Sequence, residues 1–230
     1  MLDLDALTGE VARSLEAAAD PRKAEEMAAY LKSDMPFRGV QKPARKPILR
    51  AVVDRHPPAT AGEYRDAVNA LWRMPHREEK YLALGYARHF DRYVGVGRVS
   101  LFRRLVREGA WWDLVDETAI HLIGRALAKQ RVAVTPTVET MMEAPSLWER
   151  RTAIICQIGH REATDCGLLF AACTTHLDEG DFFIRKAIGW ALREYAKTDE
   201  DAVRFYVAEH RERMSALSIR EATKHFVPAS

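Results

Sequence analysis

Residues 111–116, with the sequence WWDLVD, combine side chains that can hold a positive charge. Trp112 and Asp116 are four residues apart, so in a helix the indole and the carboxylate lie on one face. An indole ring attracts cations, and the positive end of a helix keeps a nearby carboxylate ionised. The same spacing also fits an ordinary helix start, in which Asp113 or Asp116 is the cap and Trp111 or Trp112 packs in the core. Spacing alone leaves both interpretations open.

Basic residues gather in three stretches, whereas the acidic residues lie elsewhere, notably at the N-terminus and at 25–26 and 199–201. The basic clusters consist of Arg38, Lys42, Arg45, Lys46, Arg50 and Arg55, then Arg98, Arg103, Arg104 and Arg107, and finally Arg150, Arg151 and Arg161. The net charge is only +2, yet such clusters suit a phosphate-binding surface. Solvated helix faces would explain them equally well. Since no alternating aromatic residues accompany them, a duplex is favoured over a single strand.

Motifs for other chemistry are missing from the sequence. There is no G-x-S-x-G, no glycine-rich phosphate loop and no H-E-x-x-H. The eight histidines are scattered, and no His/Cys set has the spacing of metal ligands, so we expect neither a metal nor another cofactor. The three cysteines form no C-x-x-C pair, which fits a reduced, cytoplasmic protein. We expect no signal peptide and no membrane span.

Apolar residues recur at helical spacing along most of the chain, as in 80–90, where Leu82, Tyr86 and Phe90 form one stripe. We expect about a dozen helices and no strands. The expected spans are 4–19, 22–33, 42–56, 60–74, 76–90, 97–108, 112–130, 135–144, 146–160, 166–178, 181–197, 199–214 and 215–226. Many short helices favour an all-α solenoid of stacked helix pairs, with a concave face, over a four-helix bundle. We expect residues 1–230 to form a single domain.

Two local patterns support this organisation. RRTAI (150–154) and IRKAI (184–188) align at a spacing of about 34 residues, which matches Arg151 with Arg185 and suits a helix-pair repeat. One such match leaves chance as an alternative. The predicted helix ends are capping boxes at Thr60–Glu63 and Ser146–Glu149, an N-cap at Thr135 before Pro136, and terminating glycines at Gly109 and Gly180.

Four motifs occur in order along the chain: MPFRGV (35–40), WWDLVD (111–116), WERRTAIICQ (148–157) and FFIRKAIGWALREYAKTD (182–199). Together they closely resemble the AlkD family of HEAT-like-repeat DNA glycosylases, which excise alkylated purines. The resemblance extends from about residue 30 to residue 199. It implies a right-handed α-α superhelix of HEAT-like helix pairs whose concave face binds DNA.

The resemblance also implies roles for individual residues. Trp112, Trp190 and Asp116 would face the deoxyribose of the damaged nucleotide, and Arg151 would engage the nearby DNA backbone. Tyr30 would lie near the DNA. The lesion would not be flipped into a protein pocket, unlike in most glycosylases. Within WWDLVD, this assigns the functional role to Trp112 and Asp116, and leaves Trp111 as core packing and Asp113 as the helix cap.

The chemistry agrees with these roles. An N3- or N7-alkylated purine is cationic and is already a good leaving group, so breaking its glycosidic bond moves positive charge onto the sugar. Trp112 and Trp190 would stabilise that charge by roughly 0.5–2 kcal/mol each. Asp116 at ~4 Å would add about 4 kcal/mol at an intermediate dielectric, and could orient the attacking water. No general acid accompanies them, so we predict weak action on neutral lesions.

The sequence therefore predicts a monofunctional DNA glycosylase of base excision repair, acting as a monomer on duplex DNA that contains N3- or N7-alkylpurines. The residues expected to contact DNA are Arg151, Tyr30, Arg38, Lys42, Arg45, Lys46, Arg150 and Arg185. Three alternatives stay open: the same chemistry tuned to bulky minor-groove adenine adducts, a non-catalytic binder of DNA structures, and a solenoid that binds another protein.

Overall fold

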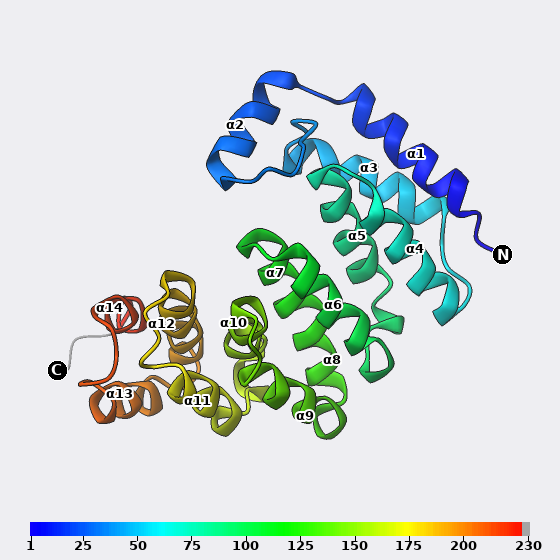
Figure 1. Ribbon diagram of the computed structural model, residues 1–230. Coiled ribbons are helices and arrows are strands. Elements are labelled where there is room, and N and C mark those ends of the chain that lie inside the picture. Colours follow the sequence, from blue (N-terminus) through cyan, green and yellow to red (C-terminus); the bar gives the residue numbers. More distant parts are fainter. Residues whose placement is uncertain (227–230) are drawn as a thin grey trace. The chain divides into compact units, whose positions relative to one another are not determined.

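The computed structural model describes residues 1–226, and all regular structure in that part of the chain is helical (Figure 1). The predicted all-α, solenoid-like fold is thereby confirmed. The chain forms two compact units, Met1–Val94 and Gly95–Ser230, which we term the N-terminal and C-terminal units. That residues 1–230 act as one domain stays a prediction. No helix within 1–226 is long and apolar enough to span a bilayer.

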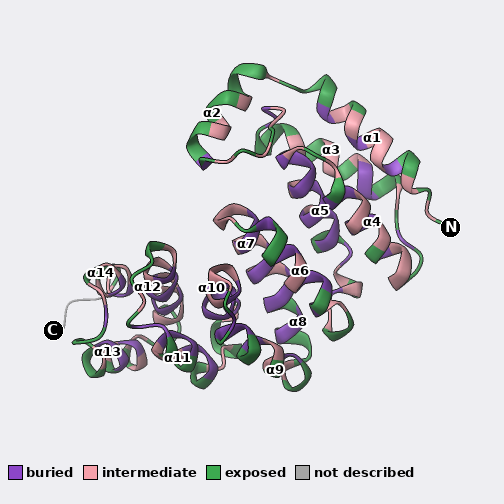
Figure 2. Ribbon diagram, in the orientation of Figure 1, coloured by how far each residue is buried: buried purple, intermediate pink, exposed green. Residues whose placement is uncertain are grey.

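The N-terminal unit packs five α-helices around an apolar core. They are α1 (Leu4–Ala17), α2 (Pro21–Leu31), α3 (Lys42–Arg55), α4 (Ala61–Arg73) and α5 (Arg77–His89), followed by the short 3₁₀ turn Asp91–Tyr93. Helix α3 packs against α1 and α5, and α4 packs against α5. Helix α2 buries only Leu31 and is mostly exposed (Figure 2). This unit's core therefore depends on the other four helices.

The backbone of the MPFRGV motif (35–40) is held in place by a buried acid. Glu78, at the start of α5, accepts hydrogen bonds from the backbone N–H groups of Arg38, Gly39 and Val40 at 3.0, 2.9 and 3.0 Å. Gly39 has a φ of +79°, and a Cβ there would lie 1.9 Å from the carbonyl oxygen of Asp20. Only glycine fits this close approach. The motif thus fixes the path of the chain between α2 and α3.

The C-terminal unit stacks its helices in two rows (Figure 1). One row contains α7 (Trp112–Thr118), α10 (Leu147–Ile155), α12 (Phe182–Ala196) and α14 (Ala216–Ala222). The second contains α9 (Arg131–Met142), α11 (Cys166–Thr175) and α13 (Glu200–Glu209), and the unit begins with the 3₁₀ turn Val96–Arg98 and α6 (Val99–Gly109). Within the first row, α10 packs against α7 and α12, and α12 packs against α14. This neighbour-on-neighbour packing is typical of helical repeats.

The helix starts reveal a repeat that the sequence shows only faintly. The N-cap residues of α3, α5, α7, α10 and α12 are Gln41, His76, Trp111, Ser146 and Asp181. Successive N-caps are 35 residues apart. Equivalent residues of neighbouring repeats are therefore separated by 35 positions, which we call the N-cap register.

The predicted alignment at 34 residues is corrected by this register. Arg185 is the counterpart of Arg150, and Lys186 is the counterpart of Arg151. Because residues 150 and 151 are both arginine, the sequence alone permitted either alignment.

Several predicted helix ends differ from the observed ones. Helix α9 begins at Arg131 and carries Pro136 inside it, so Thr135 is not its cap. Ser146 is an N-cap without a side-chain cap bond, and the carboxylate of Glu149, the other half of the predicted capping box, pairs with Arg103. Gly109 does end α6, whereas α11 already ends five residues before Gly180.

At Thr60 the predicted capping box is half formed. The Thr60 hydroxyl accepts from the N–H of Glu63 at 3.1 Å. The Glu63 carboxylate, however, accepts from the N–H groups of Ala59 and Leu2.

The predicted helix 112–130 contains an irregular turn. Residues 119–123 form a π-helical turn between α7 and α8 (Gly124–Lys129). A Cβ on Gly124 would lie 2.0 Å from the carbonyl oxygen of Cys156, so this segment packs closely on the end of α10. The extra residue in the turn changes which side chains face α10.

Candidate functional site

A buried ion pair joins α7 to α10. Arg151 donates from Nε to one Asp116 carboxylate oxygen at 2.8 Å and from Nη2 to the other at 2.7 Å. Its Nη1 donates to the backbone oxygen of Phe183, in the first turn of α12, at 2.6 Å. Arg151 is only 4% exposed. One guanidinium therefore fixes the catalytic candidate on α7 against two neighbouring helices.

The environment of Asp116 acts on its charge in two directions. Burial, the largest effect, raises the pKa of the carboxyl, the hydrogen bonds and charge of Arg151 lower it, and the charge of Asp113 raises it. The pKa of Asp116 therefore lies above the usual aspartate value. A carboxylate that is poorly solvated, and held in place by fixed donors, attracts a developing positive charge more strongly than one in water.

The two tryptophans of the predicted site lie on α7 and α12. Trp112 is the first residue of α7, one turn before Asp116, and is half-buried. The predicted cap is wrong: Trp111 is the N-cap, and Asp113 lies in the first turn. Trp190 is half-buried on α12, two helical turns after the Phe183 carbonyl that binds Arg151, or about 10 Å farther along the axis.

Helix α12 is held firmly beside Trp190. A Cβ on the preceding Gly189 would lie 2.5 Å from the Cβ of Glu221 on α14. Glu221 also binds Lys186 at 2.6 Å and pairs with Arg193, both on α12. These contacts fix the orientation of the helix that carries Trp190.

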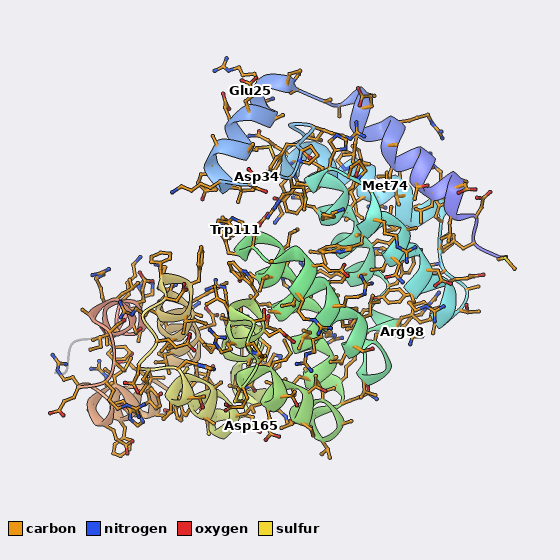
Figure 3. All side chains as sticks on the ribbon, viewed as in Figure 1. Glu25, Asp34, Met74, Arg98, Trp111 and Asp165 are labelled. Atoms are coloured by element: carbon orange, nitrogen blue, oxygen red, sulfur yellow. The ribbon has the colours of Figure 1, made fainter. Side chains whose placement is uncertain are left out.

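A group of aromatic rings lies beside the Asp116–Arg151 pair, since the Arg151 guanidinium carbon is 6.0 Å from the Phe183 ring. The sequence assigns only one of these rings, Trp111, as core packing. The ring centroids of Trp111, Trp148 and Phe183 lie 5.0–5.7 Å apart, and Phe182 contacts Phe183 at 5.5 Å. We call these four residues the aromatic cluster. Trp111 marks its position at the start of α7 (Figure 3). The signal that would have found the cluster is the N-cap register, because all four rings lie within three residues of a helix start.

Residues 11–226 match the profile of the family described as DNA alkylation repair enzyme. The chain belongs to the DNA alkylation repair enzyme family. It is also similar to a solved structure described as "Predicted DNA alkylation repair enzyme from Enterococcus faecalis", with 29% identity and a TM-score of 0.84. That match covers 92% of this chain and 98% of the other. A comparison with curated proteins finds no match.

In this family member, all three of the predicted DNA contacts on the C-terminal unit are engaged by protein groups. Arg150 binds both carboxylate oxygens of Glu179 at 2.9 and 3.1 Å and donates to two backbone oxygens before α10. Arg185 donates from Nε to the backbone oxygen of Glu179 at 3.0 Å. Arg151 uses three of its five N–H groups within the protein. A role of these arginines in DNA binding stays a prediction.

The remaining predicted contacts lie on the N-terminal unit. Tyr30 is 75% exposed on α2, and Lys42 and Lys46 are exposed on α3. Arg45 donates to the backbone oxygen of Val40 at 2.6 Å and lies over the ring of Tyr81.

Arg38, also a predicted DNA contact, is paired with acidic side chains of the protein. It binds the buried Glu79 at 3.2 Å and pairs with Glu16. In residues 1–226, no group of His, Cys, Asp or Glu side chains could hold a metal ion.

Proposed function

We propose that the protein is a DNA glycosylase that hydrolyses the N-glycosidic bond of N3- and N7-alkylpurines in duplex DNA. The observation that carries this proposal is the half-buried Asp116 carboxylate, bound by Nε and Nη2 of the buried Arg151 one turn from Trp112. Membership of the DNA alkylation repair enzyme family supports DNA as the substrate. The wider match of the four sequence motifs supports the glycosylase chemistry.

The reaction needs a partner for a transient cation. When the bond between C1′ and the base nitrogen breaks, its electron pair stays with the alkylpurine, which leaves neutral, and the sugar becomes positive. Asp116 stabilises that charge, together with the faces of Trp112 and Trp190. Water then attacks C1′ and loses a proton. The released base carries no new proton, so no general acid is needed.

Arg151 has a cost as well as a use in this mechanism. Its positive charge offsets part of the attraction between Asp116 and the sugar, so the pair supplies less than the ~4 kcal/mol of an isolated carboxylate at 4 Å. In return, the two hydrogen bonds fix the carboxylate before the substrate arrives, which avoids reorganisation during the reaction. The two N–H groups of Arg151 that the protein leaves unused would meet a phosphate of the bound strand.

Base release from methylated duplex tests the proposal directly. The wild type should release 7-methylguanine and 3-methyladenine, and Asp116→Asn should slow release by at least about 100-fold, corresponding to ~2.7 kcal/mol. DNA binding by the variant should be largely retained. Asp113→Asn is the matched control, because it removes an acid from the first turn of the same helix, whereas the hydrogen bonds of Arg151 go to Asp116 and Phe183.

The outcomes separate the candidate functions. Equal rates for Asp116→Asn and wild type would refute the mechanism. Tight binding of branched or damaged DNA with no base released by the wild type would favour a non-catalytic binder of DNA structures. A protein without DNA affinity at any salt concentration would favour a protein-binding solenoid. Binding to DNA should instead weaken steeply as salt is added, since it depends on phosphate contacts. Parallel release assays with a methyl and a bulky adenine adduct would identify the preferred lesion.

A further inference from the structure

The N-cap register gives Trp112 a counterpart on α12. Trp112 is the first helical residue after its N-cap, and Phe182 occupies the same position after Asp181, two repeats later. The corresponding residue of α10 is Leu147. Helices α7, α10 and α12 stand in one row (Figure 1). Phe182 is therefore an aromatic residue at the repeat position that the proposed active site uses for Trp112.

Phe182 is exposed, yet it is firmly supported. It is 58% exposed, while its ring meets the ring of Phe183 edge-on at 5.5 Å. Phe183 in turn contacts Trp111 and Trp148. A network of half-buried rings thus holds this exposed apolar ring at a fixed place.

The ring also lies close to the proposed active site. Phe183 provides the backbone oxygen that binds Arg151, and the Arg151 guanidinium carbon lies 6.0 Å from the Phe183 ring. The two ring distances together place Phe182 within about 12 Å of that guanidinium. At 3.4 Å per base, this upper limit corresponds to no more than about three to four nucleotides along a strand.

We propose that Phe182 stacks on the face of a base that becomes exposed beside the damaged nucleotide. This inference rests on the proposed function and adds to it a specificity-determining contact. A neutral, flat, apolar ring does not pair with phosphate, but it stacks on any base. In intact duplex the bases cover each other, so this contact forms only where a base step is disturbed. Phe182 therefore favours damaged over undamaged DNA.

A binding assay that needs no base release tests the contact. The probes are a duplex with a tetrahydrofuran abasic analogue beside 2-aminopurine and the same duplex intact, at one fixed salt concentration. Wild type should bind the abasic probe more tightly than the intact one, with a change in 2-aminopurine fluorescence. Phe182→Ala should reduce that preference by about five- to tenfold, the low end of the range for one base–aromatic stack, and should bind intact duplex as wild type does.

The chain offers a matched control and a second variant. Phe205 on α13 is 71% exposed and makes no ring contact within residues 1–226, so Phe205→Ala should keep the full preference. Phe182→Trp should retain the preference, and Phe182→Leu should lose it although leucine is apolar. Unchanged unfolding midpoints show that each variant is folded.

The outcomes distinguish the inference from the proposed function. A Phe182→Ala variant with the wild-type preference and fluorescence change overturns the stacking contact. So does an equal loss in Phe205→Ala. If wild type releases no alkylated base but its preference for the abasic probe depends on Phe182, the proposed function fails and the contact stands.

Discussion

Breaking the Asp116–Arg151 pair from either side should strongly destabilise the C-terminal unit. Arg151 is 4% exposed and the Asp116 side chain 16% exposed, and two hydrogen bonds of 2.8 and 2.7 Å join them. Removing one partner of a buried pair costs about 3–5 kcal/mol because the other charge stays uncompensated. The residual exposure of Asp116 places Asp116→Leu and Arg151→Met near 3 kcal/mol each. The double variant should recover most of that loss, since neither charge remains.

Urea unfolding of the four proteins measures this coupling energy. Losses in the single variants that simply add in the double variant would refute a direct pair, as would single variants within about 0.5 kcal/mol of wild type. The pH dependence of base release gives a second readout. Asp116 acts when ionised, so activity is lost as the pH falls through its raised pKa. Arg151→Met removes the group that lowers this pKa, and should therefore move the loss to higher pH.

Three further predictions concern the rest of the chain. Gly39→Ala should destabilise the N-terminal unit by more than about 2 kcal/mol in thermal unfolding, because backbone blocks its Cβ at a positive φ, whereas Gly62→Ala, which meets only a hydroxyl at 3.6 Å, should not. Salt-bridging lowers the pKa of Glu221 from 4.5 to about 2, so its stabilising effect is complete above pH 4.5 and is lost as the pH falls towards 2. Glu221→Gln should remove that part of the pH dependence of the melting temperature. In mass-spectrometric alkylation at pH 8, Cys166 should react in the folded protein, while Cys156, whose pKa burial raises to about 12, should react only after unfolding.

The helical architecture could be predicted because apolar periodicity and capping residues are local signals. The span 42–56 matches α3, Lys42–Arg55, closely. The π-helical turn 119–123 could not be predicted, since no local signal marks it and the adjoining Gly124 packs against the carbonyl of the distant Cys156. Packing of distant segments overrides local propensity there.

The candidate site could be predicted only in part, again because contacts between distant segments leave no local signal. The sequence motifs predict a site of Asp116, Arg151 and the two tryptophans, which stays a prediction, and they assign Arg151 to the DNA backbone alone. Its observed partner lies 35 residues away, and finding it requires the exact register of the repeats. The sequence alone gives Phe182 no role, because a single exposed ring carries no local signal.

The N-cap register also determines where the chain tolerates changes in length. One residue added inside α7 or α10 would turn every later side chain of that helix by about 100° and shift it by 1.5 Å, which would separate Asp116 from Arg151. The same residue added to the segment 156–165 between α10 and α11 would leave both helix starts intact, and loop length costs little free energy. Insertions and deletions among relatives that keep this site should therefore concentrate in the connecting turns.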